Sequence, residues 1–313
     1  MTFNTQRVSL IAESVVGAHY PNQTHSQWMR ALRPSLASLR NSYYTSENVH
    51  VDYASKEIVH AYTLGYAVYH AWQTYEMLED MTKAQQQVLL NKDSLSVVCI
   101  CGGPGFEVVG LLEFLRKNGS LPTVLHVTVV DKNAHAWKQH ANLAAHLDSY
   151  GVDIRWTDIN TTFTSPRLQK IRSHLQSSVA QQTIQTMLFQ AMRRADLVTA
   201  QNCLNEISLA GEEMIDLLGI MKPSAIFSCS DLSGYRPNGP KMHRLREELA
   251  EAHQIPDALH YVRFSGFRYS DDVESHFFQQ VDGLWPRRRL NTMGFVSQRQ
   301  SVSSTVFSHQ FLR

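Results

Sequence analysis

The sequence predicts an α/β fold, in which a doubly wound, mostly parallel β-sheet is preceded by an N-terminal helical extension. From residue 94 onward, short β-prone runs alternate with helical stretches, which is the pattern of βαβ units. Runs such as residues 127–130 are largely apolar, as strands covered on both faces require. Residues 54–81 instead carry apolar and aromatic side chains at spacings of three and four, which is typical of an amphipathic helix.

The N-terminal part, residues 1–93, is expected to form the helical extension. Its first 50 residues show no regular pattern and contain Pro21 and Pro34, so we expect them to be irregular. The long helix over residues 54–81 follows. The Gln- and Lys-rich stretch at residues 83–93 then reads as the polar end of this helix and a linker.

The second part, residues 94–313, is expected to form the sheet domain. Strands are predicted at residues 96–101, 124–130, 152–157, 196–200 and 225–230. Helices are predicted from the glycine-rich turn to residue 114, around residues 137–147, and over residues 212–221, 242–252 and 175–192. The last of these lies in an inserted segment, residues 161–194. Two late β-prone runs, residues 275–281 and 303–311, are expected to form an antiparallel hairpin at the sheet edge.

Composition excludes several classes of protein. The chain has 313 residues, of which 43% are hydrophobic, so it can bury a full core and is not wholly disordered. It has no run of 18 apolar residues to span a membrane, and its first ten residues do not show the pattern of a secretory signal, so we expect none. Its four cysteines form no CxxC pair, and its 15 histidines form no HExxH motif, so we expect no metal site. A cytoplasmic or nuclear location fits these features.

The formal net charge is only +1, but the charges are unevenly distributed. Residues 1–46 carry +3 and residues 283–313 carry +5, whereas the middle of the chain is acidic. Arg287, Arg288 and Arg289 follow Trp285-Pro286, and guanidinium groups beside an aromatic ring suit phosphates and bases. The run is therefore a candidate RNA contact. The alternative is a solvated loop, paired with the acidic middle of the chain.

The central motif is a glycine-rich turn, Gly102-Gly103-Pro104-Gly105, between the first predicted strand and its helix. Such a turn lets backbone amides approach a ligand, and the helix start favours negative charge. The alternative is a tight turn without a ligand. A dinucleotide fingerprint would have a third glycine where Val108 stands, which disfavours NAD.

Two acidic residues accompany the next strands. Asp131 directly follows the second predicted strand, where a carboxylate can accept hydrogen bonds from ribose hydroxyls. The alternative is that Asp131 caps the next helix. Asp158 follows the third predicted strand, where it is placed to contact an adenine amino group, or else to stabilise a turn.

This arrangement resembles the class I S-adenosylmethionine-dependent methyltransferases, over about residues 94–232. The resemblance implies a Rossmann-like core and S-adenosylmethionine as the cofactor. It departs from the family at Cys99, where an acid is usual, and at Cys101, where the first glycine is usual. The implied cofactor-binding residues are Cys101, Gly102, Gly103, Pro104, Gly105, Asp131, Lys132, Asp158, Ile159 and Asn202.

In this family the methyl acceptor meets the cofactor at the end of the fourth strand. Asn205 and Glu206 follow that strand, and the Leu-Asn-Glu stretch is weakly similar to ribosomal RNA base methyltransferases. An amide and a carboxylate there can orient a base edge and accept a proton. The alternative is that the pair begins the next helix. Cys203 reads as a small buried residue rather than a nucleophile.

The sequence therefore predicts an S-adenosylmethionine-dependent methyltransferase whose acceptor is RNA. Two alternatives stay open. One is a small-molecule methyltransferase whose acceptor pocket the aromatic helix at residues 62–75 would cover. The other is a non-catalytic protein that senses S-adenosylmethionine or acts in an assembly, which the departures at Cys99 and Cys101 motivate. The oligomeric state does not follow from the sequence.

Overall fold

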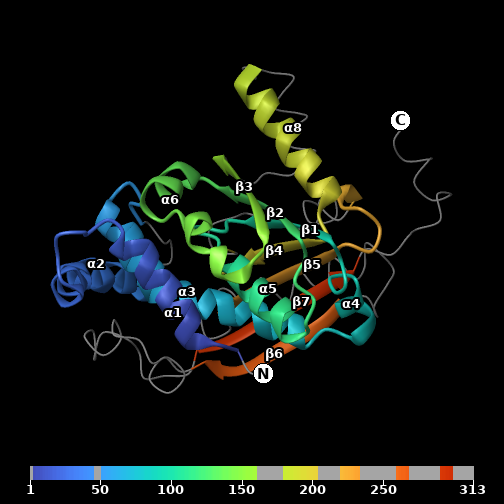
Figure 1. Ribbon diagram of the computed structural model, residues 1–313, viewed down its shortest axis with the longest axis horizontal. Coiled ribbons are helices and arrows are strands. Elements are labelled where there is room, and N and C mark those ends of the chain that lie inside the picture. Colours follow the sequence, from blue (N-terminus) through green and yellow to red (C-terminus); the bar gives the residue numbers. More distant parts are fainter. Residues whose placement is uncertain are drawn as a thin grey trace.

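The computed structural model describes residues 3–45, 51–160, 179–203, 219–232, 259–267 and 290–298. In this part of the chain the centre is a seven-stranded sheet with the order β3-β2-β1-β4-β5-β7-β6 (Figure 1). Strands β1 to β5 are parallel, whereas β7 is antiparallel to both β5 and β6. The predicted fold class, a Rossmann-like doubly wound sheet of the class I methyltransferase type, is confirmed. The strands are β1 (Ser94–Ile100), β2 (Val124–Asp131), β3 (Asp153–Asn160), β4 (Leu197–Gln201), β5 (Ile226–Leu232), β6 (Leu259–Phe267) and β7 (Leu290–Gln298).

The strand order creates a switch point between β1 and β4. From β1 the chain proceeds to β2 and β3 on one side, while β4 and β5 lie on the other side. Ile100 lies opposite Val130 on β2 and Ala200 on β4, so the three strands end at the same edge. Ligands of open α/β sheets bind outside the carboxyl ends of the strands at such a point. The fold alone therefore directs attention to this edge.

Among the described residues before the sheet there are four helices, and the first two correct the expectation for residues 1–50. The described residues 3–45 are mostly helical rather than irregular. Figure 1 shows α1, α2 and α3 gathered beside the sheet, at the end of the molecule where the blue colours lie. The helices are α1 (Thr5–Gly17), α2 (His25–Thr45), α3 (Lys56–Glu79) and α4 (Lys83–Gln87).

Pro34 lies inside α2, although a proline in the sequence usually indicates an interruption of regular structure. A proline in a helix removes one backbone hydrogen bond, to the carbonyl group four residues earlier. That residue is Arg30, and both Arg30 and Pro34 are exposed, so water can satisfy the carbonyl. The opposite face is fully apolar and buried, which holds the helix in place despite the proline. Its buried residues are Trp28, Met29, Leu32, Leu36 and Leu39.

Helix α3 is confirmed close to its predicted bounds and is buried on nearly all sides. It packs against α5 (Phe106–Lys117), the helix that follows β1. At the contact, a Cβ atom added to Gly110 of α5 would lie 2.2 Å from the backbone oxygen of Ala71 in α3. Only glycine permits this approach.

Of the helices that the structure describes, none combines the length and apolarity needed to cross a bilayer.

The two faces of the sheet contact different helices. Side chains alternate along a strand, so Val97 and Val98 of β1 point to opposite faces. Val97 joins the core formed with α1, α2, α3 and α5. Val98 joins a smaller core with α8 (Val179–Arg194), which projects from the molecule in Figure 1. The larger core continues across residue 93, and the predicted domain boundary there stays a prediction.

Several other elements differ from prediction. The helix expected around residues 137–147 is α6 (Ala134–His140), followed by two short 3₁₀ turns, Leu143–His146 and Asp148–Tyr150. β3 continues three residues beyond its predicted end, to Asn160. The predicted helices at residues 212–221 and 242–252 lie largely or wholly outside the described residues, as do the late runs at residues 275–281 and 303–311. The antiparallel pair at the sheet edge is β6 and β7, which the sequence analysis did not predict.

The amino end of the sheet is anchored by Asp196, which directly precedes β4. Its carboxylate accepts the backbone N–H of Ser96 at 2.8 Å and pairs with Lys92 and with Lys222, the latter at 2.5 Å. Asp196 is buried, whereas both lysines are about one third exposed. These contacts connect β1, β4 and the segment before β5 at the edge opposite the switch point.

Candidate functional site

The glycine-rich turn lies at the switch point, between β1 and α5. Its backbone is left-handed at Cys101 (φ 52°), Gly103 (φ 51°) and Gly105 (φ 85°). The turn is closed by hydrogen bonds from Cys101 N to Val130 O and from Gly105 N to Gly102 O, both 2.7 Å long. Side chains other than glycine rarely adopt this conformation, so Cys101 carries backbone strain. A glycine would adopt this conformation without that strain.

Three aromatic side chains cover the turn. A Cβ atom at Gly105 would lie 2.6 Å from Cη2 of Trp156, and one at Gly103 would lie 3.7 Å from Trp137 and 3.8 Å from Tyr62. Tyr62 comes from α3, Trp137 from α6 and Trp156 from β3, so three separate elements meet at the turn. Access to the backbone of the turn therefore depends on these three rings.

Asp131 lies at the end of β2, and its carboxylate holds the turn. It accepts hydrogen bonds from Gly103 N at 3.1 Å, Asn133 N at 2.7 Å and the indole N–H of Trp137 at 3.2 Å. The N-cap of α6 is Asn133, so Asp131 does not cap that helix directly. Asp131 thus joins the turn to one of its covering rings, at the place where the sequence analysis expected a ribose contact.

Asp158 and Ile159 lie inside the end of β3 rather than after it. Asp158 accepts the indole N–H of Trp156 at 2.8 Å and thereby fixes the ring that covers Gly105. Ile159 points to the other face of the sheet and packs in the core beside α8. The two residues predicted to contact adenine therefore lie on opposite faces, and only Asp158 lies near the turn. Lys132, the next residue after β2, is exposed.

Asn202 follows β4 at the same edge and also has a left-handed backbone (φ 51°). Its amide Nδ2 donates to Gln73 Oε1 at 2.8 Å and lies 3.4 Å from His70 Nδ1. The structure thus brings Asn202 to α3, close to the turn. Asn205 and Glu206, the predicted catalytic pair, lie outside the described residues, as do Arg287, Arg288 and Arg289.

His70 and Gln73 are the site residues that the sequence analysis missed. Asn202 Nδ2 can only donate, so His70 Nδ1 accepts and the ring donates from Nε2 to the hydroxyl of Tyr62, 3.1 Å away. Burial lowers the pKa of His70 to about 4, so the ring is neutral near pH 7. A polar pair three residues apart, inside an otherwise buried helix, was the available signal.

Several buried polar atoms near this edge have no hydrogen-bond partner. They include Gln73 Nε2 from α3, Asn202 Oδ1 after β4, and Glu107 Oε2 from the first turn of α5. Buried polar groups are almost always paired, so each such group needs an explanation. These three atoms come from different elements around the switch point, and one bound polar ligand would explain all of them.

Two thiols near the turn are not nucleophiles. A hydrogen bond with Cys101 and burial raise the pKa of the Cys203 thiol well above its usual value. Burial and the neighbouring Glu107 likewise raise the pKa of Cys99. Neither thiol ionises near neutral pH, and thiolates are the reactive form.

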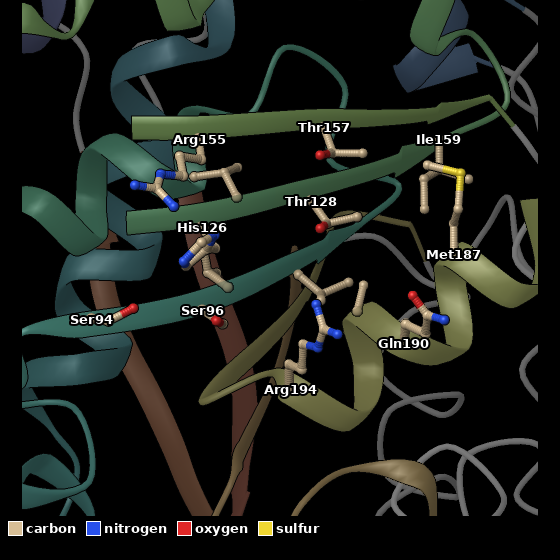
Figure 2. A pocket seen from close by; sticks show the side chains of 14 residues that line it. Ser94, Ser96, His126, Thr128, Arg155, Thr157, Ile159, Met187, Gln190 and Arg194 are labelled. Atoms are coloured by element: carbon tan, nitrogen blue, oxygen red, sulfur yellow. The ribbon is translucent and has the colours of Figure 1, made fainter. Parts of the chain in front are cut away.

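A separate cavity of about 390 Å³ lies on the other face of the sheet, between β1, β2, β3 and α8. Figure 2 shows Thr128, Thr157 and Arg155 on the strands facing Arg194 and Gln190 on α8. Of the predicted site residues that the structure describes, Ile159 alone lines it. The cavity is therefore distinct from the switch-point site.

Comparisons with known proteins give similarities of fold. No family model matches the chain, and no curated protein matches it. The plantazolicin methyltransferase BpumL, solved in complex with SAH, is 14% identical; the match covers 88% of this chain and 98% of that one, with a TM-score of 0.42. The CurJ carbon methyltransferase is 12% identical, with coverage of 94% and 71% and a TM-score of 0.43.

A putative sarcosine dimethylglycine methyltransferase from Galdieria sulphuraria is 13% identical. The match covers 76% of this chain and 86% of that one, with a TM-score of 0.37. At these identities and scores no site residue is transferred from these proteins. The sheet order and the geometry of the switch point carry the functional argument instead.

Proposed function

We propose that this chain is a methyltransferase that binds S-adenosylmethionine at the switch point between β1 and β4. The observation that carries the proposal is the glycine turn, whose Gly103 amide is held by Asp131 from the end of β2. A strand, a glycine turn and a helix with an acid at the next strand end form a nucleoside-binding arrangement. S-adenosylmethionine, when bound, supplies an electrophilic methyl group on its sulfonium.

The residues present fit this cofactor. Asp131 offers carboxylate oxygens suited to ribose hydroxyls, and the left-handed turn beside it needs the glycines at Gly103 and Gly105. Asn202 Oδ1 and Gln73 Nε2 are an unpaired acceptor and an unpaired donor, suited to the amino and carboxylate groups of an amino-acid moiety. The rings of Tyr62, Trp137 and Trp156 exclude water from the turn.

Methyl transfer requires mainly that the acceptor be held in line with the sulfonium. His70 is neutral near pH 7, and its Nδ1 lone pair is already used by Asn202, so we assign it a structural role in orienting Asn202. Asn205 and Glu206 remain the proposed residues for orienting the acceptor and accepting its proton, because they directly follow this strand end.

Two acceptor classes are proposed. The position of α3, whose Tyr62 lies over the turn beside Tyr66, favours an enclosed small-molecule acceptor. The basic run Arg287-Arg288-Arg289 instead favours RNA. Incubation of the full chain with radiolabelled S-adenosylmethionine and fractionated RNA, protein and small-molecule extracts separates these classes. Label in no fraction, together with tight cofactor binding, would favour the sensor alternative.

Asp131→Asn is expected to weaken binding of S-adenosylhomocysteine about 10- to 100-fold, as measured by calorimetry. A hydrogen bond to a charged group contributes about 1.5–3 kcal/mol, and the substitution replaces a carboxylate with a neutral amide. Asp153→Asn is the matched control, since Asp153 lies at the other end of β3 and forms an exposed pair with Arg155. Equal affinity in both variants would refute the role assigned to Asp131.

A further inference from the structure

Glu107 is a buried acid that the proposed reaction does not use. It is the second residue of α5, two positions after Gly105, and is only 2% exposed. Its own backbone N–H hydrogen-bonds the carboxyl group, whereas Oε2 is buried without a partner. A buried carboxyl with one unpaired oxygen is unfavourable unless it is protonated or serves a ligand.

The surroundings of Glu107 are acidic or neutral. Asp131 on β2 is its charged neighbour, and burial together with Asp131 raises the pKa of Glu107 to about 8. Cys99 on β1 stays a neutral thiol, because burial and Glu107 raise its pKa. His70 on α3 is neutral above pH 5, since burial lowers its pKa to about 4. Asp158 on β3 accepts a hydrogen bond from the indole N–H of Trp156.

Two acids therefore lie beside one glycine turn. Asp131 comes from the end of β2, and Glu107 comes from the first turn of α5. Near pH 7 most Glu107 side chains are protonated in the absence of a ligand. A positive charge brought to the turn stabilises the ionised form, because it offsets the repulsion from Asp131. S-adenosylmethionine is such a cation, because its ammonium and carboxylate groups cancel and its sulfonium leaves one positive charge, whereas its demethylated product has no net charge.

We propose that Glu107 is a positioning residue that loses its proton to solvent when a cationic ligand occupies the turn, so that ligand binding and proton release are coupled. This inference rests on the proposed cofactor site and deepens it. The ionised carboxyl acts through the field at the turn rather than by touching the methyl group. Affinity therefore rises with pH, because the ionised form binds the cation more tightly than the protonated form does.

The test is calorimetry of S-adenosylmethionine binding to the full chain at pH 7, in two buffers that differ in ionisation enthalpy. For an acid with a pKa of about 8 that ionises fully on binding, about 0.9 proton per site is released. Glu107→Gln keeps the size and the neutral state of the side chain but cannot ionise. It is expected to release no proton, and its affinity is expected to stay level between pH 6 and 8, where that of the wild type rises more than tenfold.

Glu113→Gln is the matched control, because Glu113 is on the same helix and is also only 2% exposed. Its carboxylate accepts from the Tyr150 hydroxyl and from Arg116, both at 2.6 Å, away from the turn. This variant is expected to release as many protons as the wild type. If the wild type binds without releasing a proton, or Glu107→Gln releases as many, the coupling is overturned and the cofactor site stands. If the wild type does not bind at all, both proposals fall.

Discussion

Gly110→Ala is expected to lower the free energy of unfolding by about 1–2 kcal/mol, the largest stability effect anticipated for a single methyl group in this chain. The added Cβ would lie 2.2 Å from the backbone oxygen of Ala71 and 2.8 Å from Cβ of Thr74. Neither atom belongs to the flexible end of a side chain, so α3 and α5 must separate. Overpacking costs about 1–3 kcal/mol and occasionally more, which outweighs the roughly 1 kcal/mol that alanine gains over glycine in a helix.

Denaturant unfolding followed by circular dichroism measures this change. Gly219→Ala is the control, since nothing lies within 4 Å of a Cβ atom at that position and its backbone is not left-handed. The control is expected to match the wild type or to exceed it slightly. Unchanged stability in Gly110→Ala would mean that the two helices do not approach as closely as described. Since α3 carries His70 and Gln73, the destabilised variant is also expected to bind ligand more weakly.

Gly105→Ala is expected to reduce the affinity for S-adenosylhomocysteine at least 100-fold, equivalent to about 2.8 kcal/mol. The new Cβ would lie 2.6 and 2.8 Å from two atoms of the Trp156 ring. Asp158 holds that ring through its indole N–H, so the ring cannot simply turn away. The backbone at this position also has φ 85°, which an alanine adopts only with strain of about 1–2 kcal/mol. The turn must therefore deform, and its amides move.

Two further variants separate the causes of this loss. Gly119→Ala tests the left-handed backbone alone, because Gly119 has φ 63° but open space around it. It is expected to lower stability without changing affinity. Combining Gly105→Ala with Trp156→Ala removes the clash and should recover part of the affinity. Calorimetry that finds wild-type affinity in Gly105→Ala alone would exclude the turn as the binding site.

The local parts of the site were predictable from the sequence. The apolar strand β1, the glycine turn after it and Asp131 at the end of β2 follow from short-range patterns, and the structure places them together. Strand bounds were less predictable, as β3 shows. Polar residues at its end concealed three further residues of strand, which moved Asp158 and Ile159 from a loop onto opposite faces.

The tertiary parts of the site were not predictable. Asn202 lies 132 residues from His70 in the chain, and only the folded sheet brings the two side chains to hydrogen-bonding distance. Pro34 suggested an irregular segment, because the sequence does not reveal that this proline lies on the exposed face of α2, where a helix tolerates it. Glu107 likewise reads as an ordinary first-turn glutamate until its burial beside Asp131 is known.

Strand β4 has very different ends, and the difference bears on attempts to engineer this protein. Its amino end is fully satisfied, since Asp196 accepts from Ser96 and pairs with two lysines. Its carboxyl end retains a left-handed Asn202 with an unpaired buried oxygen. Stabilising substitutions at functional sites commonly reduce activity. Asn202→Gly would relieve the left-handed backbone but leave buried Gln73 Oε1 without its donor, so it should lower ligand affinity without raising thermal tolerance. Thermostabilising changes are therefore best sought around the anchored end.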